Sequence, residues 1–180
     1  MTSFPNKEAE LQEVGFIKDK QSITADWSAH GLQLIEGVVV REVKHVLKNN
    51  GHVTELYRRD WELDDQSVDQ VFQVVLQPAG LSAWHIHETT TDRLFVSVGT
   101  VKIVLCDLRP QSPTFGLLNE FRVGELRPQL IVVPPQVAHG VQNIGHDKAV
   151  LLNLVDRAYQ YEDPDHWRIS YPSSRIPYQF

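Results

Sequence analysis

Residues 80–99 read Gly80-Leu-Ser-Ala-Trp-His85-Ile-His87-Glu-Thr-Thr-Thr-Asp92-Arg-Leu-Phe-Val-Ser-Val-Gly99, and they carry most of the evidence for the fold. Because His85 and His87 are two residues apart, a β-strand would point both imidazoles to the same face. Asp92 follows five residues after His87, and the later block Pro134-Pro-Gln-Val-Ala-His139-Gly-Val-Gln-Asn143 supplies a third imidazole. We therefore expect His85, His87, Asp92 and His139 to converge inside a small β-barrel.

The whole chain has the composition of one ordinary globular domain. Its 180 residues are enough for a full core, and 42% of them are hydrophobic while 22% are charged. The formal net charge of −6 argues against a nucleic-acid partner. No apolar run is long enough to span a membrane and the first residues lack a signal-peptide pattern, so we expect no membrane partner and a cytoplasmic location. The single cysteine, Cys106, lies in an apolar run and is expected to be buried.

Short apolar strands alternate with turn residues from about residue 33 onward. Asn49-Asn50-Gly51 is a hairpin signal, and Pro78-Ala79-Gly80 ends another strand. Helices do not alternate with the strands, so the pattern favours a sandwich or barrel over a parallel sheet. The expected strands are 35–43, 52–58, 71–76, 82–87, 93–98, 101–108, 117–123, 129–133 and 149–155.

The two ends of the chain differ from the strands between them. Residues 7–14 have helical composition, so we expect residues 1–32 to form an arm with a short helix and residues 33–180 to form one barrel domain. The acidic stretch 60–69 is interpreted as a solvated loop. From about residue 159 the chain is rich in aromatic residues and proline, which predicts a flap over an open barrel end, with a short helical turn near 163–168.

The two histidine-containing blocks resemble the two motifs of the cupin superfamily. The first motif has a glycine, a His-x-His pair, an acid and a second glycine, and here Asp92 stands where glutamate is usual. The second reads Pro-x-Gly-x-x-His-x-x-x-Asn, and Gln136 replaces its glycine. The resemblance implies an all-β fold, namely a double-stranded β-helix or jelly roll.

Over residues 33–180 the chain is more narrowly similar to the dTDP-4-dehydrorhamnose 3,5-epimerase family. The resemblance is carried by Asp107-Leu-Arg109-Pro-Gln-Ser-Pro-Thr-Phe-Gly116 and by Ala138-His139-Gly140. It implies an isomerase without a cofactor that acts on a nucleotide-linked 4-keto sugar and forms homodimers. The site residues that it implies are His85 as the catalytic base and Arg93 near the enolate oxygen, with the substrate contacted by Gln70, Glu55, Tyr159 and Tyr161.

Several family residues are replaced in this chain. Ser82 and Asn50 stand where the family has arginines, and neither offers a cationic fork for a diphosphate. The family's catalytic tyrosine aligns near Leu152 or Asn153. By the resemblance, the carboxylate that orients the family's catalytic histidine belongs to a Leu-Ser-x-Lys-Asp segment that aligns beyond residue 180.

Two other functions remain open from the sequence. The first is a metal-dependent cupin, because imidazoles and a carboxylate suit a divalent transition metal such as Fe, Mn, Ni or Zn. Its ligands would be His85, His87, Asp92 and His139. The second is a non-catalytic jelly roll that binds a saccharide and whose histidines bond within the barrel wall. The remaining histidines are interpreted as surface or structural residues: His30, His45, His52, His146 and His166.

Overall fold

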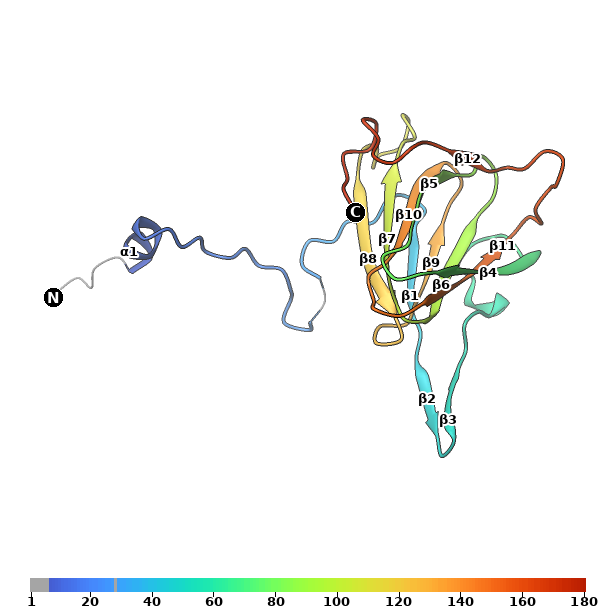
Figure 1. Ribbon diagram of the computed structural model, residues 1–180, viewed down its shortest axis with the longest axis horizontal. Coiled ribbons are helices and arrows are strands. Elements are labelled where there is room, and N and C mark those ends of the chain that lie inside the picture. Colours follow the sequence, from blue (N-terminus) through green and yellow to red (C-terminus); the bar gives the residue numbers. More distant parts are fainter. Residues whose placement is uncertain (1–6, 28) are drawn as a thin grey trace. The chain divides into compact units, whose positions relative to one another are not determined.

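The computed structural model describes residues 7–27 and 29–180 and divides into two compact units, one up to residue 33 and one over 34–180 (Figure 1). In the first unit, α1 (Lys7–Glu13) is the short helix that the composition predicts. The apolar side chains in this helix and just after it, Leu11, Val14 and Phe16, are exposed. None of the helices in the described part of the chain has the length and hydrophobicity to cross a membrane.

The second unit is a jelly roll of two five-stranded antiparallel sheets, which confirms the all-β prediction (Figure 1). The sheet orders are β1-β9-β6-β11-β4 and β12-β5-β10-β7-β8, and a separate hairpin pairs β2 with β3. The strand bounds are β1 (Val39–Glu42), β2 (His45–Lys48), β3 (Gly51–Thr54), β4 (Gln70–Leu76), β5 (Leu81–Ile86), β6 (Asp92–Val98), β7 (Thr100–Asp107), β8 (Leu118–Gly124), β9 (Gln129–Val133), β10 (Val137–Asn143), β11 (Ala149–Val155) and β12 (Trp167–Arg168).

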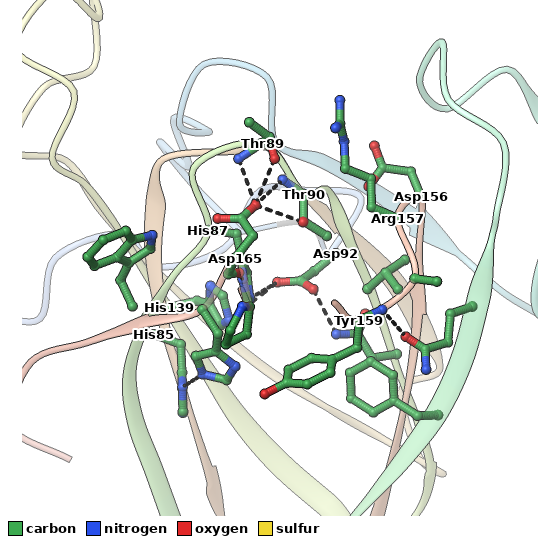
Figure 2. A pocket seen from close by; sticks show the side chains of 18 of the residues that line it. His85, His87, Thr89, Thr90, Asp92, His139, Asp156, Arg157, Tyr159 and Asp165 are labelled. Carbon is green, nitrogen blue, oxygen red and sulfur yellow. Dashed lines mark hydrogen bonds and ion pairs between the residues drawn. The ribbon is translucent and has the colours of Figure 1, made fainter. Parts of the chain in front are cut away.

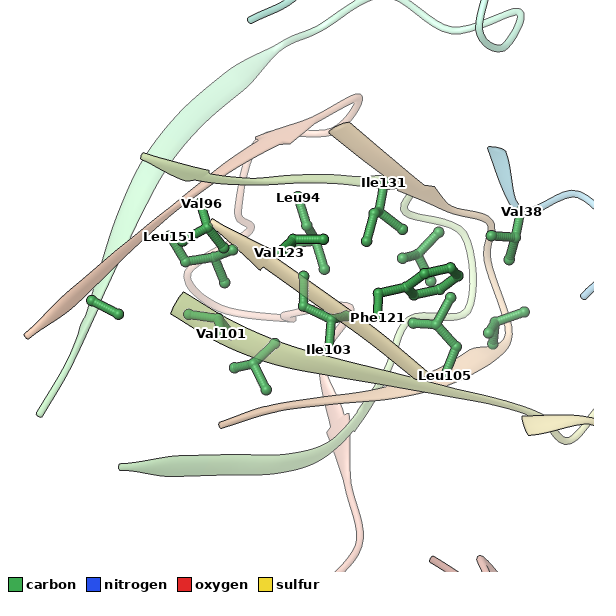
Figure 3. Close-up of a cluster of buried hydrophobic side chains, with 14 of the residues drawn as sticks. Val38, Leu94, Val96, Val101, Ile103, Leu105, Phe121, Val123, Ile131 and Leu151 are labelled. Carbon is green, nitrogen blue, oxygen red and sulfur yellow. The ribbon is translucent and has the colours of Figure 1, made fainter. Parts of the chain in front are cut away.

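The core lies between the facing sides of the two sheets (Figure 3). Along β7, every second residue points inward, so Val101, Ile103 and Leu105 are fully buried and pack among Leu94 of β6 and Ile131 of β9. Burial of each such side chain contributes roughly 1.5–3 kcal/mol. This period-two pattern holds the two sheets together.

The outer faces of both sheets are covered as well. The C-terminal segment runs over the β5–β10–β7–β8 sheet, where Ile176 and Phe180 pack on Trp84 and Cys106. Cys106 is buried as expected, and this burial raises the pKa of its thiol to about 11. On the other sheet, Leu130 and Phe95 are covered by the segment 56–63, which contains the short 3-10 helix η1 (Arg59–Trp61). A central strand such as β7 therefore buries apolar side chains on both of its faces.

Local differences from the sequence prediction have identifiable causes. The turn at Asn49-Asn50 is confirmed, but its second strand ends at Thr54 rather than at residue 58. The helical turn expected at 163–168 is absent because Trp167 and Arg168 pair with β5 as a short edge strand. Gln136, which replaces a motif glycine, keeps the left-handed backbone conformation of that position, with φ 64°.

The loop formed by residues 107–116, at the end of β7, is stabilised by a buried carboxylate. Asp107 is fully buried, and its carboxylate accepts hydrogen bonds from Arg109, Ser112 and Thr114. In turn, Arg109 Nη2 donates to the Glu36 carbonyl at 2.7 Å and Thr114 Oγ1 accepts from the Glu36 N–H at 2.9 Å. Burial opposes ionisation of Asp107, but these hydrogen bonds hold the pKa of its carboxyl well below the usual range.

Candidate active site

A pocket of about 790 Å³ is lined by strands from both sheets and by the C-terminal segment 156–168 (Figure 2). It contains His85, His87, His139 and Asp92, whose side chains point toward one another. The volume suits a small-molecule ligand, and the concentration of titratable groups in one concave site is typical of an active site.

Strand register explains why so many imidazoles meet here. His85 of β5 pairs with His139 of β10 on one side and with Arg168 of β12 on the other. Directly paired residues of an antiparallel sheet share a face, so these three side chains form a row across three strands. His87 lies two residues further along the same face. A register shift between β5 and β10 also brings Ser82 beside His85.

Both ring nitrogens of His85 have partners. Nε2 lies 2.8 Å from the Ser82 hydroxyl, and Nδ1 lies 2.7 Å from Nε2 of His166. Burial lowers the pKa of His85 to about 3, and the charges of His139 and His166 act in the same direction. The ring is therefore neutral at neutral pH, which is the form able to accept a proton.

His87, Asp92 and His139 form a separate cluster with donor atoms within 4.8 Å of one another. Nε2 of His87 and Nε2 of His139 each lie 3.3 Å from Oδ2 of Asp92. The other ring nitrogen of each histidine faces a backbone carbonyl: His87 Nδ1 bonds Asp165 O, and His139 Nδ1 lies 3.4 Å from Val137 O. Burial lowers the pKa of His139, although Asp92 opposes this shift.

Asp165 anchors the C-terminal segment to the turn that joins β5 and β6. Its carboxylate accepts hydrogen bonds from the backbone N–H groups of Glu88, Thr89 and Thr90 and from both threonine hydroxyls (Figure 2). Burial opposes ionisation, but these bonds hold the pKa of Asp165 well below its usual range. Asp165 thereby fixes the position of His166, the next residue.

The structure brings His85, His87, Asp92 and His139 together as the motif spacing predicts. Gln70 and Tyr159, expected to contact the substrate, also line this pocket. They are linked because the Tyr159 N–H donates to Gln70 Oε1 at 2.9 Å.

Arg93 lies elsewhere, and its expected position near the enolate oxygen is wrong. It is the sequence neighbour of Asp92 on β6, so its side chain points to the opposite face of the sheet. There it is fully buried, where its guanidinium pairs with the Asp64 carboxylate and donates to Leu154 O and Gln66 O. Arg93 is a structural residue, and Asp64, in the stretch interpreted as a solvated loop, is its counter-ion.

Glu55 and Tyr161 also lie outside the pocket. The Glu55 carboxylate pairs with Arg58 at 3.2 Å, and Tyr161 is 87% exposed with its ring edge-on to Tyr159. His85, expected among the metal ligands, lies beside the His87–Asp92–His139 cluster, and its two ring nitrogens face Ser82 and His166 instead.

Sequence reasoning missed two further contributors to the site. His166, interpreted as a surface or structural residue, contacts His85 through a hydrogen bond in the pocket. Asn153, which aligns near the family's tyrosine, donates from Nδ2 to Asp92 Oδ1 at 2.7 Å and so holds that carboxylate in place. The run Thr89-Thr90-Thr91 was a usable signal, because clustered hydroxyl and N–H donors at a turn attract a carboxylate such as Asp165.

Comparison with known proteins identifies the family. The model of the dTDP-4-dehydrorhamnose 3,5-epimerase family matches residues 33–180. The chain belongs to this family. Among its relatives is the probable low-salt glycan biosynthesis epimerase Agl13 of Haloferax volcanii, 34% identical over 138 residues, which are 76% of this chain and 88% of the relative. Spore coat polysaccharide biosynthesis protein SpsL of Bacillus subtilis is 29% identical over 82% of this chain and 97% of its own length.

The fold agrees with that of solved members of the epimerase family. The crystal structure of a dTDP sugar isomerase from Desulfovibrio desulfuricans G20 superposes with a TM-score of 0.75 at 27% identity, covering 81% of this chain and 91% of that one. Together with the family match, this makes the protein a sugar epimerase, and the prediction of an isomerase is confirmed.

Proposed function

We propose that this epimerase acts on a nucleotide-linked 4-keto hexose and that His85 is its catalytic base. The observation that carries the proposal is a neutral, buried imidazole in the pocket, held from two sides by Ser82 and His166. A positioned neutral imidazole is the group most often used to remove a proton in enzymes. This chemistry needs no cofactor for the deprotonation itself.

The reaction proceeds by enolisation. The proton on the carbon next to the keto group passes to Nε2 of His85, and the bonding electron pair moves toward the keto oxygen. The Ser82 hydroxyl, which faces Nε2 at 2.8 Å, turns about a single bond to make room. A proton returned to the opposite face of the same carbon gives the epimer. We assign this return to Tyr159, the tyrosine that lines the pocket.

The diphosphate of the substrate needs cationic partners, and the family's arginines are replaced by Ser82 and Asn50. Among the residues that line the pocket, the lysine or arginine side chains are Arg157 and Arg168. Both are exposed, so their guanidinium groups are accessible to a ligand entering from solvent. We assign these two arginines to the diphosphate and Gln70 to a polar group of the substrate.

Solvent exchange tests the proposed function directly. Enolisation must precede epimerisation, so incubation of a nucleotide-linked 4-keto-6-deoxyhexose with the protein in D₂O should introduce deuterium at C3 or C5. Mass spectrometry and proton NMR read this uptake even where net conversion is small. Uptake no higher than in a protein-free blank, across several nucleotide sugars, would reject the proposal.

A bound divalent metal is a second candidate feature, favoured by the donor set of His87, Asp92 and His139. Because the Nδ1 atoms of both imidazoles face backbone carbonyls, their Nε2 lone pairs face the Asp92 carboxylate. Such carbonyl-bonded histidines are typical of metal ligands, and the set suits Fe, Mn, Ni or Zn. When bound, the ion would supply Lewis-acid polarisation of a substrate oxygen.

We predict that replacing His87 with alanine removes stoichiometric metal binding, whereas His85→Ala retains it. The reason is that the carboxylate of Asp92 faces His87 and His139, while the nitrogens of His85 are bonded to Ser82 and His166. Elemental analysis of protein purified without added metal, and calorimetric titration with Fe²⁺, Mn²⁺, Ni²⁺ and Zn²⁺, measure the difference. Protein that holds no metal and takes up none of the four ions would exclude this candidate.

We also propose a homodimer, in line with the family resemblance. β4 lies at the edge of its sheet, and Val71, Phe72 and Val75 on it are exposed. An exposed apolar edge strand is a ready surface for pairing with a second copy. A monomer mass in sedimentation equilibrium at micromolar concentration would contradict this assembly.

A further inference from the structure

A chain of hydrogen bonds runs across the pocket wall from β12 to β5. Arg168 Nε–H donates to His166 Nε2 at 3.3 Å. The same His166 atom lies 2.7 Å from Nδ1 of His85, and Nε2 of His85 lies 2.8 Å from the Ser82 hydroxyl. The two imidazoles are nearly perpendicular, with ring centroids 4.9 Å apart and an interplanar angle of 71°.

The direction of this chain follows from Arg168. A guanidinium has only donors, so His166 Nε2 must be an acceptor and carries no proton. The hydrogen bond between the two imidazoles is therefore donated by His85 Nδ1–H. This leaves the lone pair of His85 on Nε2, where it accepts from the Ser82 hydroxyl. With the opposite direction, His166 Nε2–H and Arg168 Nε–H would be two donors facing each other.

The backbone holds His166 from both sides. Asp165, immediately before it, is bonded to the turn after β5 by five hydrogen bonds. Trp167 and Arg168, immediately after it, pair with Ile86 and His85 of β5. With both neighbours fixed to the same strand and turn, the His166 ring is set against His85.

We propose that His166 is the positioning residue of His85, holding it in the tautomer whose Nε2 accepts the substrate proton. This inference rests on the proposed function, in which His85 is the base. In this proposal a neutral imidazole orients the catalytic histidine, whereas the family pattern described above uses a carboxylate. Arg168 also contributes, because its Nε–H donates to Nε2 of His166 and so keeps that nitrogen unprotonated.

Two matched variants test the proposal. His166→Phe keeps the ring shape but offers no acceptor, while His166→Gln offers a carbonyl oxygen near the position of Nε2. We expect His166→Phe to lower kcat for exchange by about 10–100-fold, the usual effect of losing a residue that orients a catalytic group, with KM changed less than about twofold. His166→Gln should recover most of kcat. His146→Phe, at an exposed histidine in the β10–β11 turn, is the control.

The tautomer of His85 gives a readout that a purely structural role would not move. In the ¹⁵N-histidine NMR spectrum of the unmodified protein, His85 should show a protonated Nδ1 and an unprotonated Nε2, and His166→Phe should give a mixture of both tautomers. The reverse tautomer in the unmodified protein would overturn the proposal, whether or not the Phe variant folds. So would full kcat in a folded His166→Phe protein whose exchange still depends on His85. Exchange that is indifferent to His85→Ala would instead reject the base assignment.

Discussion

Replacing His85 with alanine is expected to slow deuterium uptake next to the keto group by about 10²–10⁴-fold, the usual cost of losing a general base. His85 is the pocket imidazole whose Nε2 faces a rotatable hydroxyl, whereas the Nε2 atoms of His87 and His139 face a carboxylate. The rate is read from the initial slope of uptake in D₂O at saturating substrate. His146→Ala, which removes an exposed histidine of the β10–β11 turn, should exchange at the unmodified rate.

Two outcomes would contradict this assignment. Uptake that persists in His85→Ala but disappears with a chelator would move the chemistry to the His87–Asp92–His139 cluster. Uptake that persists in both conditions would point to a base elsewhere in the pocket. Because His85 is buried, the melting temperature of the variant must be measured alongside, so that loss of activity is not confused with loss of fold.

Replacing Asp107 with alanine is expected to lower the free energy of unfolding by about 3–5 kcal/mol, as removal of one partner from a buried ion pair does. The side chain of Arg109 is largely buried, and it would lose the carboxylate that it bonds at 2.8 Å. The hydroxyls of Ser112 and Thr114 would lose the same acceptor. Urea denaturation measures the change, and Asp65→Ala, at an exposed acid, is the control, with an expected change below about 0.5 kcal/mol.

The same site predicts a pH dependence. The folded-state pKa of Asp107 lies below the unfolded value of about 3.9. Its contribution to stability is therefore fully present above that value and is lost as pH falls toward the folded-state pKa. The stability difference between the unmodified protein and Asp107→Asn should shrink as pH drops below about 4. A difference that is the same at pH 7 and pH 3 would show that the charge of Asp107 does not stabilise the fold.

The sequence predicted the barrel and the four converging side chains from alternation along the strands and from the resemblance to the two cupin motifs. His85 and His87 share a face by strand geometry, and the alternation of Val101, Ile103 and Leu105 predicts which face of β7 is inward. The same alternation places the Arg93 side chain on the other face of β6 from Asp92, so Arg93 could have been excluded from the pocket. Its partner Asp64 lies 29 residues away in an irregular loop, and no local pattern predicts such a pairing.

The position of His166 in the site could not be predicted from the sequence, for a different physical reason. Its place in the site depends on pairing between β12 and β5, a contact across 81 residues. Pro164 and the acids around it favour a helix start locally, and the free edge of β5 overrides that preference. The separation of His85 from the His87–Asp92–His139 cluster could not be predicted from the sequence either. The partners of the imidazole rings, such as Ser82 and Val137 O, depend on side-chain orientation rather than on spacing.

The late position of β12 has a consequence for protein synthesis. As the chain leaves the ribosome, β5 emerges long before its edge partner, and Trp84 emerges before the residues around Ile176 that cover it. A nascent chain that already has both sheets therefore carries an unpaired edge and a bare aromatic surface, features that invite misassembly. The pocket is completed only when β12 docks, because His166 and Arg168 line it. Catalytic competence therefore depends on a segment that is made after the other strands of both sheets.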